Sequence, residues 1–408
     1  MNKDVPNIRH LRAFLAVAES QSISAASRRV FISQPAITQA IAKMEKALGV
    51  ALFDRRPEGV FLTEAGGLFH DRVERMLRHL QAGVAEAMKA AGRRTAKSMQ
   101  SLDQNLTGVQ LRALIAISEA ANFSLAARAV GISQPSLHRA ARDLEHLAGV
   151  PLFEKANRGI LLTKPGEILA MQGRLALVEY EQGLEELGEW RGEDSGGIVV
   201  GSMPLSRTFL LPTAITMLTR ERPDARIEVV DGPYEDLLNG LRRGELDLLI
   251  GALRDPLPIG DIVQEPLFND PLAVVARVGH PLHARSGAPE VAELARWPWV
   301  VPRRGTPSRA HFEALFADAG VAVPAALVET GSAILIRGLL ESSDRLTLIS
   351  LHQIRHEMQW GLLAPLPLDL PGTARPIGLT VRKDWRPTAT QARFLTLLRE
   401  AGQVVHAT

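Results

Sequence analysis

Cysteine is absent from this sequence of 408 residues. Its absence excludes disulfide frameworks, cysteine-ligated metal sites and thiol-based redox sensing, and it is typical of a reducing compartment. The sequence also lacks any run of about 18 uncharged apolar residues, the length that a membrane span needs. The apolar stretch near the N-terminus carries charges and has no small-residue cleavage site, so we expect no secretory signal. A cytoplasmic protein without a membrane partner is predicted.

The sequence also has no large excess of positive or negative charge. It contains 47 Lys and Arg residues and 45 Asp and Glu residues, which gives a net charge of +2. A balance so close to zero does not by itself indicate a nucleic-acid partner. Apolar residues form 46% and charged residues 23% of the chain, close to the average of folded proteins, which excludes wholesale disorder. At about 100–200 residues per domain, the chain has room for two to four domains.

The first part of the chain contains an internal repeat. Residues 11–66 align with residues 111–166 without a gap, and 23 of the 56 aligned positions are identical. The segment LRAFLAVAES aligns with LRALIAISEA, and ISQPAITQA aligns with ISQPSLHRA. A period this long is typical of a duplicated domain and excludes a solenoid of short repeats.

Each copy of the repeat predicts three helices followed by a β-hairpin. In the first copy, apolar residues at helical spacing predict a helix from Leu11 onward, and a short Ala-rich helix follows over 24–30. The third helix is expected over 34–48, with Ser33 as its N-cap and Pro35 in its first turn. Two β-prone segments separated by RRPEG then predict a wing. This order is that of a winged helix-turn-helix.

The third helix of each copy is interpreted as a recognition helix for the DNA major groove. Gln can contact adenine through two hydrogen bonds, Ala and the Thr methyl group can contact a thymine methyl, and a helix N-terminus can bind phosphate. Three-helix units also occur as protein-contact modules, an alternative that stays open for both copies. The candidate DNA contacts are Ser33, Gln34, Pro35, Ala36, Thr38, Gln39, Lys43, Arg55 and Arg56 in the first copy, and Ser133, Gln134, Ser136, His138, Arg139, Arg142 and Arg158, with Lys155 and Asn157 in the same wing, in the second.

The motifs of the first copy resemble those of LysR-type transcriptional regulators. The pattern L-x-x-F-L-A-V-A-E-x-x-S-x-S-x-A-A, followed by S-Q-P-A-I-T, L-G-V-x-L-F-x-R and L-T-E-A-G, carries the resemblance over residues 8–92, and it continues more loosely to the C-terminus. The family pattern normally has one such domain. The second copy departs from it, with Ala148 before Gly149 and Lys164-Pro165 in place of Glu-Ala. Whether the second copy contacts DNA therefore stays open.

An amphipathic helix is predicted after each copy, over 66–91 and within 166–195. In LysR-type proteins the corresponding helix looks like the dimerisation element. Residues 66–99 contain seven basic and three acidic residues, whereas residues 166–195 contain two basic and eight acidic ones. The two helices could be solvated faces, or they could pair within or between chains, with their charges selecting the partner. The polar segment 93–107 is interpreted as a flexible tether.

From Gly196 onward, short β-rich segments alternate with helices, which indicates an α/β structure. The chain is expected to leave one lobe near Pro271 and to return near Gly378, so that two crossing strands join two lobes. This organisation resembles the effector domain of LysR-type regulators and, more distantly, periplasmic binding proteins.

A ligand of an open α/β sheet binds beyond the C-terminal ends of strands, at helix N-termini. Three loops meet this description, and the one after the WVVP strand has arginines, hydroxyls and backbone N–H groups suited to a carboxylate or phosphate. An ordinary helix cap with solvated arginines is the alternative for that loop. The stretches GTPSRAHFEALF and ILIRGLLESSDRL resemble a LysR-type subgroup that regulates sugar uptake and aromatic-acid catabolism, which implies an anionic or sugar-like effector. The candidate effector-binding residues are Ser202, Ser206, Arg207, Tyr234, Arg304, Gly305 and Thr306.

Catalytic motifs are not visible in the sequence. His352 and His356 are four positions apart and could face one metal ion, but Gln353 stands where the helical zinc motif has glutamate, and no third ligand is evident. There is no G-x-S-x-G, no phosphate-binding glycine loop and no cysteine nucleophile. We therefore predict a binding protein without catalytic residues, metal or cofactor.

The expected fold is multidomain: two all-α winged helix-turn-helix domains followed by an α/β, two-lobed, periplasmic-binding-protein-like effector domain. The expected partners are double-stranded DNA, a small-molecule effector, further copies of the chain in a dimer or tetramer, and RNA polymerase. A solute-binding receptor and an enzyme fused to DNA-binding domains are the alternatives from other classes. The expected boundaries are 1–65 and 108–165 for the helix-turn-helix domains, 66–92 and 166–195 for the linker helices, 93–107 for the tether, and 196–408 for the effector domain, with lobe I at 196–270 and 379–408 and lobe II at 271–378.

Overall fold

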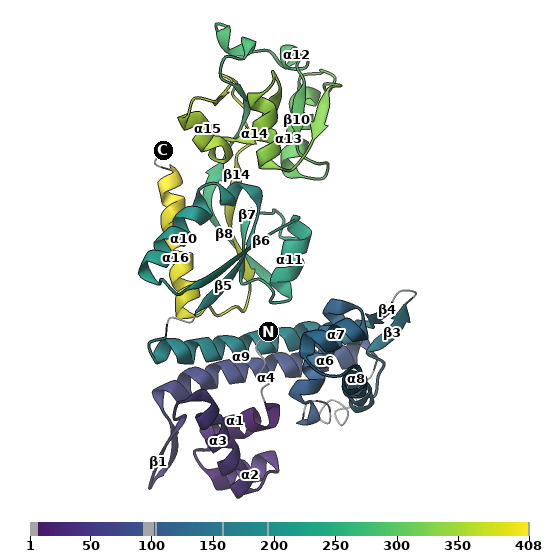
Figure 1. Ribbon diagram of the computed structural model, residues 1–408, viewed down its shortest axis with the longest axis vertical. Coiled ribbons are helices and arrows are strands. Elements are labelled where there is room, and N and C mark those ends of the chain that lie inside the picture. Colours follow the sequence, from purple (N-terminus) through teal and green to yellow (C-terminus); the bar gives the residue numbers. More distant parts are fainter. Residues whose placement is uncertain (1–6, 93–101, 103, 157–158, 194–195, 407–408) are drawn as a thin grey trace. The chain divides into compact units, whose positions relative to one another are not determined.

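The computed structural model describes residues 7–92, 102, 104–156, 159–193 and 196–406. The chain divides into two units, Met1–Gly196 and Gly197–Thr408 (Figure 1). The first unit is mainly helical, and the second contains two five-stranded sheets. Within the described residues, no helix is both long and apolar enough to cross a membrane.

The first unit contains the same order of elements twice, namely three helices, a two-stranded antiparallel hairpin and a long helix. The third helix of each set begins and ends at equivalent positions of the repeat. The first set consists of α1 (Ile8–Ser20), α2 (Ile23–Val30), α3 (Gln34–Leu48), β1 (Phe53–Arg56), β2 (Gly59–Leu62) and α4 (Glu64–Ala90). The second set consists of α6 (Gly108–Ala120), α7 (Phe123–Val130), α8 (Gln134–Ala148), β3 (Phe153–Ala156), β4 (Gly159–Leu162) and α9 (Lys164–Trp190).

Local signals set the ends of these helices. Helix α2 begins after Ser22, whose side chain accepts a hydrogen bond from a backbone amide of the first turn. Ser33 at the start of α3 has extended backbone but forms no side-chain cap, whereas Ser133 at the start of α8 accepts a hydrogen bond from the amide of Ser136. Gly49 ends α3 with φ of 69°, in the left-handed region that favours glycine.

Aromatic rings join the helices and the wing of the first set. Phe14 of α1 is fully buried, with its ring centroid 5.3 Å from that of Phe53 in β1 and 5.6 Å from that of Phe69 in α4. One side chain thus holds α1 against both the wing and the long helix. The apolar face of α4 is buried at Val73, Met76, Leu77, Leu80, Val84 and Met88, and Leu68 near its start is half-buried.

The second unit contains two sheets that mix parallel and antiparallel strands. The strand order is β6-β5-β7-β14-β8 in the first sheet and β11-β10-β12-β9-β13 in the second. Strand β5 runs parallel to β6 and β7, and β14 runs antiparallel to β7 and β8. The strands are β5 (Gly197–Ser202), β6 (Arg226–Asp231), β7 (Leu248–Ala252), β8 (Ile262–Asp270), β9 (Leu272–Arg277), β10 (Trp299–Val301), β11 (Leu327–Glu329), β12 (Leu346–Ser350), β13 (Leu363–Pro365) and β14 (Arg375–Arg382).

Each sheet of the second unit has its own apolar core. Phe394 of the closing helix packs with residues of β5, β7 and β14 in the first core, and Trp299, Phe312 and Phe316 form a cluster of rings in the second. The helices are α10 (Leu210–Glu221), α11 (Tyr234–Arg242), α12 (Val291–Leu294), α13 (Pro307–Asp318), α14 (Ala333–Glu341), α15 (Arg355–Gln359) and α16 (Ala389–His406), with short 3-10 helices at Pro204–Arg207, Pro281–Ala284 and Leu351–Ile354.

The chain crosses between the two sheets twice. The first crossing lies between Asp270, the end of β8, and Leu272, the start of β9, which agrees with the expected position near Pro271. The return is earlier than the expected Gly378, because β14 begins at Arg375 and pairs there with Asp270. The two lobes of this unit are therefore joined by adjacent strands.

Candidate DNA-binding surface and ligand cleft

Helix α3 presents most of the predicted contact residues to solvent. Its buried face consists of Ile37, Ala40 and Ile41, and the predicted side chains lie on the other faces. Thr38 differs, because it is half-buried and its hydroxyl donates a hydrogen bond to the Gln34 carbonyl at 3.0 Å. The exposed predicted residues are Ser33, Gln34, Pro35, Ala36, Gln39 and Lys43.

Helix α8 has the same orientation but a different chemistry. Arg139 and Arg142 are exposed, as are Ser133, Gln134 and Ser136. Within the domain, the ring of His138 stacks on Phe123 with centroids 3.7 Å apart, and the Ser124 hydroxyl donates to Gln134 Oε1 at 3.0 Å. The second copy therefore presents Arg139 and Arg142 at the positions where the first copy has Gln39 and Ala42.

The first wing carries exposed cations. Arg55 and Arg56 are both exposed on β1, and the Arg56 Nε atom donates to Asp54 at 2.8 Å. In the second wing Lys155 is exposed, whereas the predicted Asn157 and Arg158 lie outside the described residues. The exposed cations of the first wing are suited to phosphate contacts.

Arg9 of α1 adds an exposed positive charge near the first recognition helix, and the sequence interpretation did not include it. Burial lowers the pKa of His10 in α1, and the positive charges of Lys43 and Arg9 lower it further. The positive charges of Lys43 and Arg9 therefore lie close enough to His10 to act on its pKa. Arg9 was not predicted, because its exposure on α1 depends on which side of α1 faces the other helices.

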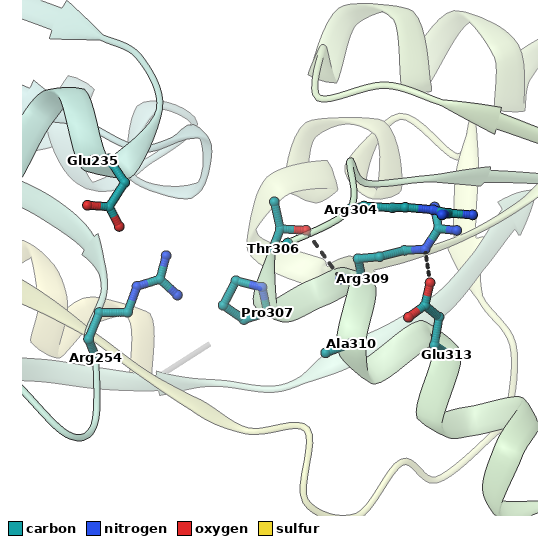
Figure 2. A pocket seen from close by; sticks show the side chains of 9 residues that line it. Glu235, Arg254, Arg304, Thr306, Pro307, Arg309, Ala310 and Glu313 are labelled. Atoms are coloured by element: carbon teal, nitrogen blue, oxygen red, sulfur yellow. Dashed lines mark hydrogen bonds and ion pairs between the residues drawn. The ribbon is translucent and has the colours of Figure 1, made fainter. Parts of the chain in front are cut away.

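The second unit contains an open cleft with a volume of about 550 Å³. Figure 2 shows Glu235 and Arg254 on one side of it, and Thr306 and Pro307 at the start of α13 on the other. Glu235 belongs to the first turn of α11, and Arg254 follows the end of β7. The lining residues are Glu235, Arg254, Arg304, Gly305, Thr306, Pro307, Arg309, Ala310 and Glu313.

Hydrogen bonds fix the α13 side of the cleft. The Thr306 hydroxyl donates to the Arg303 carbonyl at 2.8 Å and accepts from the Arg309 amide, so Thr306 caps α13. Arg309 is buried, and its guanidinium binds Glu313 at 2.7 Å and Glu329 at 3.2 Å. The helix-cap interpretation of this loop is thus correct for Thr306, and the loop lines the cleft as well.

Four of the predicted effector residues lie outside the lining of this cleft. Ser202 and Ser206 are fully buried, and their hydroxyls lie 3.1 Å apart. Arg207 forms an ion pair with Asp231 at 3.3 Å. Tyr234 is buried, and the Arg254 guanidinium lies 4.4 Å from its ring centroid. Tyr234 therefore contacts Arg254, which lines the cleft, without lining it itself.

Arg254 is the cleft residue that sequence reasoning missed. It follows β7, which runs parallel to β5 in the first sheet, as β6 does on the other side of β5. The rule that ligands bind beyond the C-terminal ends of parallel strands applied to this loop as well. The sequence interpretation used only the loops after β5, β6 and β10.

The two histidines considered as metal ligands do not lie in one regular helix. His352 is in the 3-10 helix that follows β12, and His356 is in α15, where its ring stacks on Trp360. Within the described part of the chain, no group of three or more His, Asp or Glu side chains could hold a metal ion.

Two protein-family models match this chain. The model of the LysR substrate binding domain matches residues 191–403. The model of the bacterial regulatory helix-turn-helix protein, lysR family, matches twice, at residues 8–67 and 109–167. The two matches of the second model coincide with the two sets of three helices and a hairpin.

Named relatives and a solved structure agree with these models. The HTH-type transcriptional regulator GalR of Pseudomonas putida is 35% identical over 97% of this chain and 98% of that protein. The HTH-type transcriptional regulator PcaQ of Agrobacterium fabrum is 27% identical over 74% of this chain and 96% of that protein. Full-length OxyR from Pseudomonas aeruginosa has the same fold, with a TM-score of 0.55 and 24% identity over 74% of this chain and 95% of that chain. The chain therefore belongs to the LysR family, and it is a DNA-binding transcriptional regulator with an effector-binding domain, not an enzyme.

Proposed function

We propose that this regulator responds to a small anionic effector that binds in the cleft of the second unit. The observation that carries the proposal is the charge of the lining. Glu313 neutralises Arg309 at 2.7 Å, which leaves Arg254 and Arg304 against Glu235 in the cleft. Helix α13 begins at this side of the cleft, and the positive end of its dipole favours a carboxylate or phosphate there.

The position of the cleft supports control by closure of the lobes. Glu235 and Arg254 belong to the lobe of the first sheet, and residues 304–313 belong to the lobe of the second. An anion that binds Arg254 and the start of α13 together stabilises the arrangement in which the two sides are close. The adjacent strands β8 and β14, which connect the lobes, are where the chain would bend.

In this proposal the DNA-binding surface consists of the exposed residues of α3 and α8 and the two wings. Self-association and contact with RNA polymerase, expected from the family resemblance, complete the proposal. The domain boundaries expected from the sequence assign the first unit to DNA and the second to the effector.

Calorimetric titration of the full chain with three groups of compounds tests the effector class. The groups are aromatic carboxylates, sugar phosphates and neutral sugars. We expect binding of an anionic compound, and we expect Arg254→Ala to weaken it about tenfold or more, since the variant cannot form the hydrogen bond to the charged group.

Arg303→Ala is the matched control, because Arg303 is exposed next to Arg304 but does not line the cleft. This variant should bind the anion as the unmodified chain does. Binding of neutral sugars alone, or equal affinities of all three proteins for the anion, would contradict the proposal.

A further inference from the structure

The two long helices of the first unit pair with each other inside one chain. Helices α4 and α9 run antiparallel and side by side (Figure 1). The Arg72 Nη1 atom of α4 donates to Glu179 Oε2 of α9 at 2.9 Å. At the equivalent positions of the repeat, Gln172 Oε1 of α9 lies 2.9 Å from His79 Nδ1 of α4. Position 72 of the first copy thus contacts position 179 of the second, and position 172 of the second copy contacts position 79 of the first. The same two positions of the repeat therefore meet twice.

Two glycines confirm this approximate two-fold relation. A Cβ atom added at Gly83 would lie 2.7 Å from the Cβ of Gln172, and one added at Gly183 would lie 3.0 Å from the Cβ of Arg72. Contact of position i with j and of j with i is the mark of an isologous interface between two subunits. Here both sides of that interface belong to one chain.

The charges of this interface favour pairing of unlike copies. Arg72 is fully buried and also contacts Gln182 at 2.9 Å and Glu186. Pairing of two α9 helices would place Glu179 opposite Gln172 and leave it without an arginine. Pairing of two α4 helices would place Arg72 opposite His79 instead of a carboxylate. Because a buried charge without its partner is costly, both alternatives are disfavoured.

The pairing places the two winged sets at opposite ends of the helix pair. The first set packs on the N-terminal part of α4 through Phe14 and Phe69, and the second packs on the N-terminal part of α9, where Leu111 contacts Gly173. Each helix has 27 residues, a length of about 40 Å. Half-sites one DNA turn apart are separated by about 34–36 Å, a distance of the same order.

The two recognition helices differ at their exposed positions. All of the following positions are exposed: Ala36, Gln39, Ala42 and Lys43 of α3 correspond to Ser136, Arg139, Arg142 and Asp143 of α8. Gln is suited to adenine and Arg to guanine in the major groove. The two helices are therefore suited to different base sequences.

We infer that a single chain binds two unlike half-sites, so that its operator is asymmetric duplex DNA with one chain per pair of half-sites. Contact of both winged sets with DNA belongs to the proposed function, and the inference rests on it. It predicts an adenine-containing half-site under α3 and a guanine-containing half-site under α8.

Selection of duplex DNA from a random library by the full chain, followed by footprinting and native mass spectrometry, tests the inference. We expect each pair of half-sites to contain two different half-sites and to be occupied by one chain, whatever the number of chains in the oligomer. The variant Ser136→Ala/Arg139→Gln/Arg142→Ala/Asp143→Lys gives α8 the side chains of α3 at these positions. It should select two half-sites of the α3 type and bind the original site about tenfold or more weakly.

The reciprocal variant Ala36→Ser/Gln39→Arg/Ala42→Arg/Lys43→Asp should select two half-sites of the α8 type. Both variants change exposed residues only, and circular dichroism checks that they fold. Selection of identical half-sites by the unmodified chain, or selection of its original site by the α8 variant, would overturn the inference and leave DNA binding intact. Absence of any sequence-specific binding would overturn the proposed DNA-binding surface together with the inference.

Discussion

Arg72 is a fully buried cation in the first unit, and its environment explains how a charge can lie there. Its guanidinium contacts Glu179, Glu186 and Gln182, three side chains of α9. The ion pairs raise the pKa of Arg72 although burial opposes the charged form. A buried ion pair adds little to stability compared with apolar packing, but removal of one partner leaves an uncompensated charge.

Arg72→Ala should therefore destabilise the chain strongly. We expect a decrease of about 3–5 kcal/mol in the free energy of unfolding of the first unit, because the half-buried Glu186 loses its arginine and the buried Glu179 keeps only Arg75. Urea unfolding followed by circular dichroism measures the decrease.

Arg78→Ala is the control for this change. Arg78 pairs with Glu74 on the exposed side of the same helix, at 3.1 Å. Exposed pairs of this kind contribute about 0.3–0.5 kcal/mol, so the control should unfold close to the unmodified chain. Equal urea midpoints for Arg72→Ala and Arg78→Ala would show that the buried ion pairs do not hold α4 to α9.

The same cluster predicts a dependence of stability on pH. Burial alone would raise the pKa of Glu179, but hydrogen bonds from Arg75 and Arg72 outweigh it and hold the pKa below its ordinary value. The folded state therefore binds this proton less readily than the unfolded chain. Glu179 contributes stability at neutral pH, and that contribution disappears as the pH falls below the ordinary pKa of about 4.3.

Glu179→Gln isolates this contribution. The variant should be less stable than the unmodified chain at pH 7. The difference should shrink as the pH falls from 5 to 3, because the unfolded chain takes up a proton at Glu179 in this range more readily than the folded state does. Urea midpoints across this range give the measurement. A difference that stays constant with pH would assign the effect of the substitution to packing rather than to charge.

At the scale of elements, the close approach of α4 and α9 depends on small residues. At Gly83 a Cβ atom would lie 2.7 Å from the Cβ of Gln172, and that atom is held close to the backbone of α9. The helices cannot keep their separation if this glycine gains a side chain. Gly83 is thus the place where helix propensity and packing make opposite demands.

Gly83→Ala should destabilise the pairing by about 1–3 kcal/mol, since the added methyl group overpacks the interface. Gly67→Ala in the same helix is the control, because no atom lies within 4 Å of a Cβ added there. Alanine should stabilise α4 at this position by about 0.5–1 kcal/mol. Thermal unfolding of both variants decides the sign of each effect, and stabilisation by both would contradict the close approach at Gly83.

At the scale of the whole molecule, two wings on one chain would make the DNA affinity depend steeply on salt. Each phosphate that a protein neutralises on duplex DNA contributes about 0.9 to the slope of log affinity against log salt. The first unit provides Arg55 and Arg56 in one wing and Arg139 and Arg142 on the other recognition helix, all exposed.

Arg55→Ala/Arg56→Ala should lower DNA affinity and flatten the salt slope, by about 0.9 for each phosphate that the variant no longer neutralises. Arg139→Ala/Arg142→Ala should act more weakly on the slope and shorten the protected DNA region. Fluorescence anisotropy at several salt concentrations, with footprinting, gives both readouts. Arg220→Ala, an exposed change in the second unit, should leave the slope unchanged. If Arg139→Ala/Arg142→Ala equals the unmodified chain in slope and footprint, the second winged set is a protein-contact module.

Local signals were enough to predict the helices of the first unit. Pro35 in the first turn and Gly49 at the C-cap mark α3, and the structure places that helix at the predicted residues, Gln34–Leu48. These signals act between residues a few positions apart, so they can be identified in the sequence without knowledge of the fold. The repeat and the family motifs are likewise properties of the sequence alone, and they led to the LysR family.

Tertiary structure decided which residues far apart in the chain meet. The sequence left open whether the two long helices pair within or between chains, and the hydrogen bond from Arg72 to Glu179, 107 positions away, places the pairing inside the chain. It also turned Ser202 and Ser206 inward and brought Arg254 to the cleft. Such outcomes depend on how whole elements pack, and no short-range pattern encodes them, because the energy of each interaction depends on what the rest of the chain buries around it.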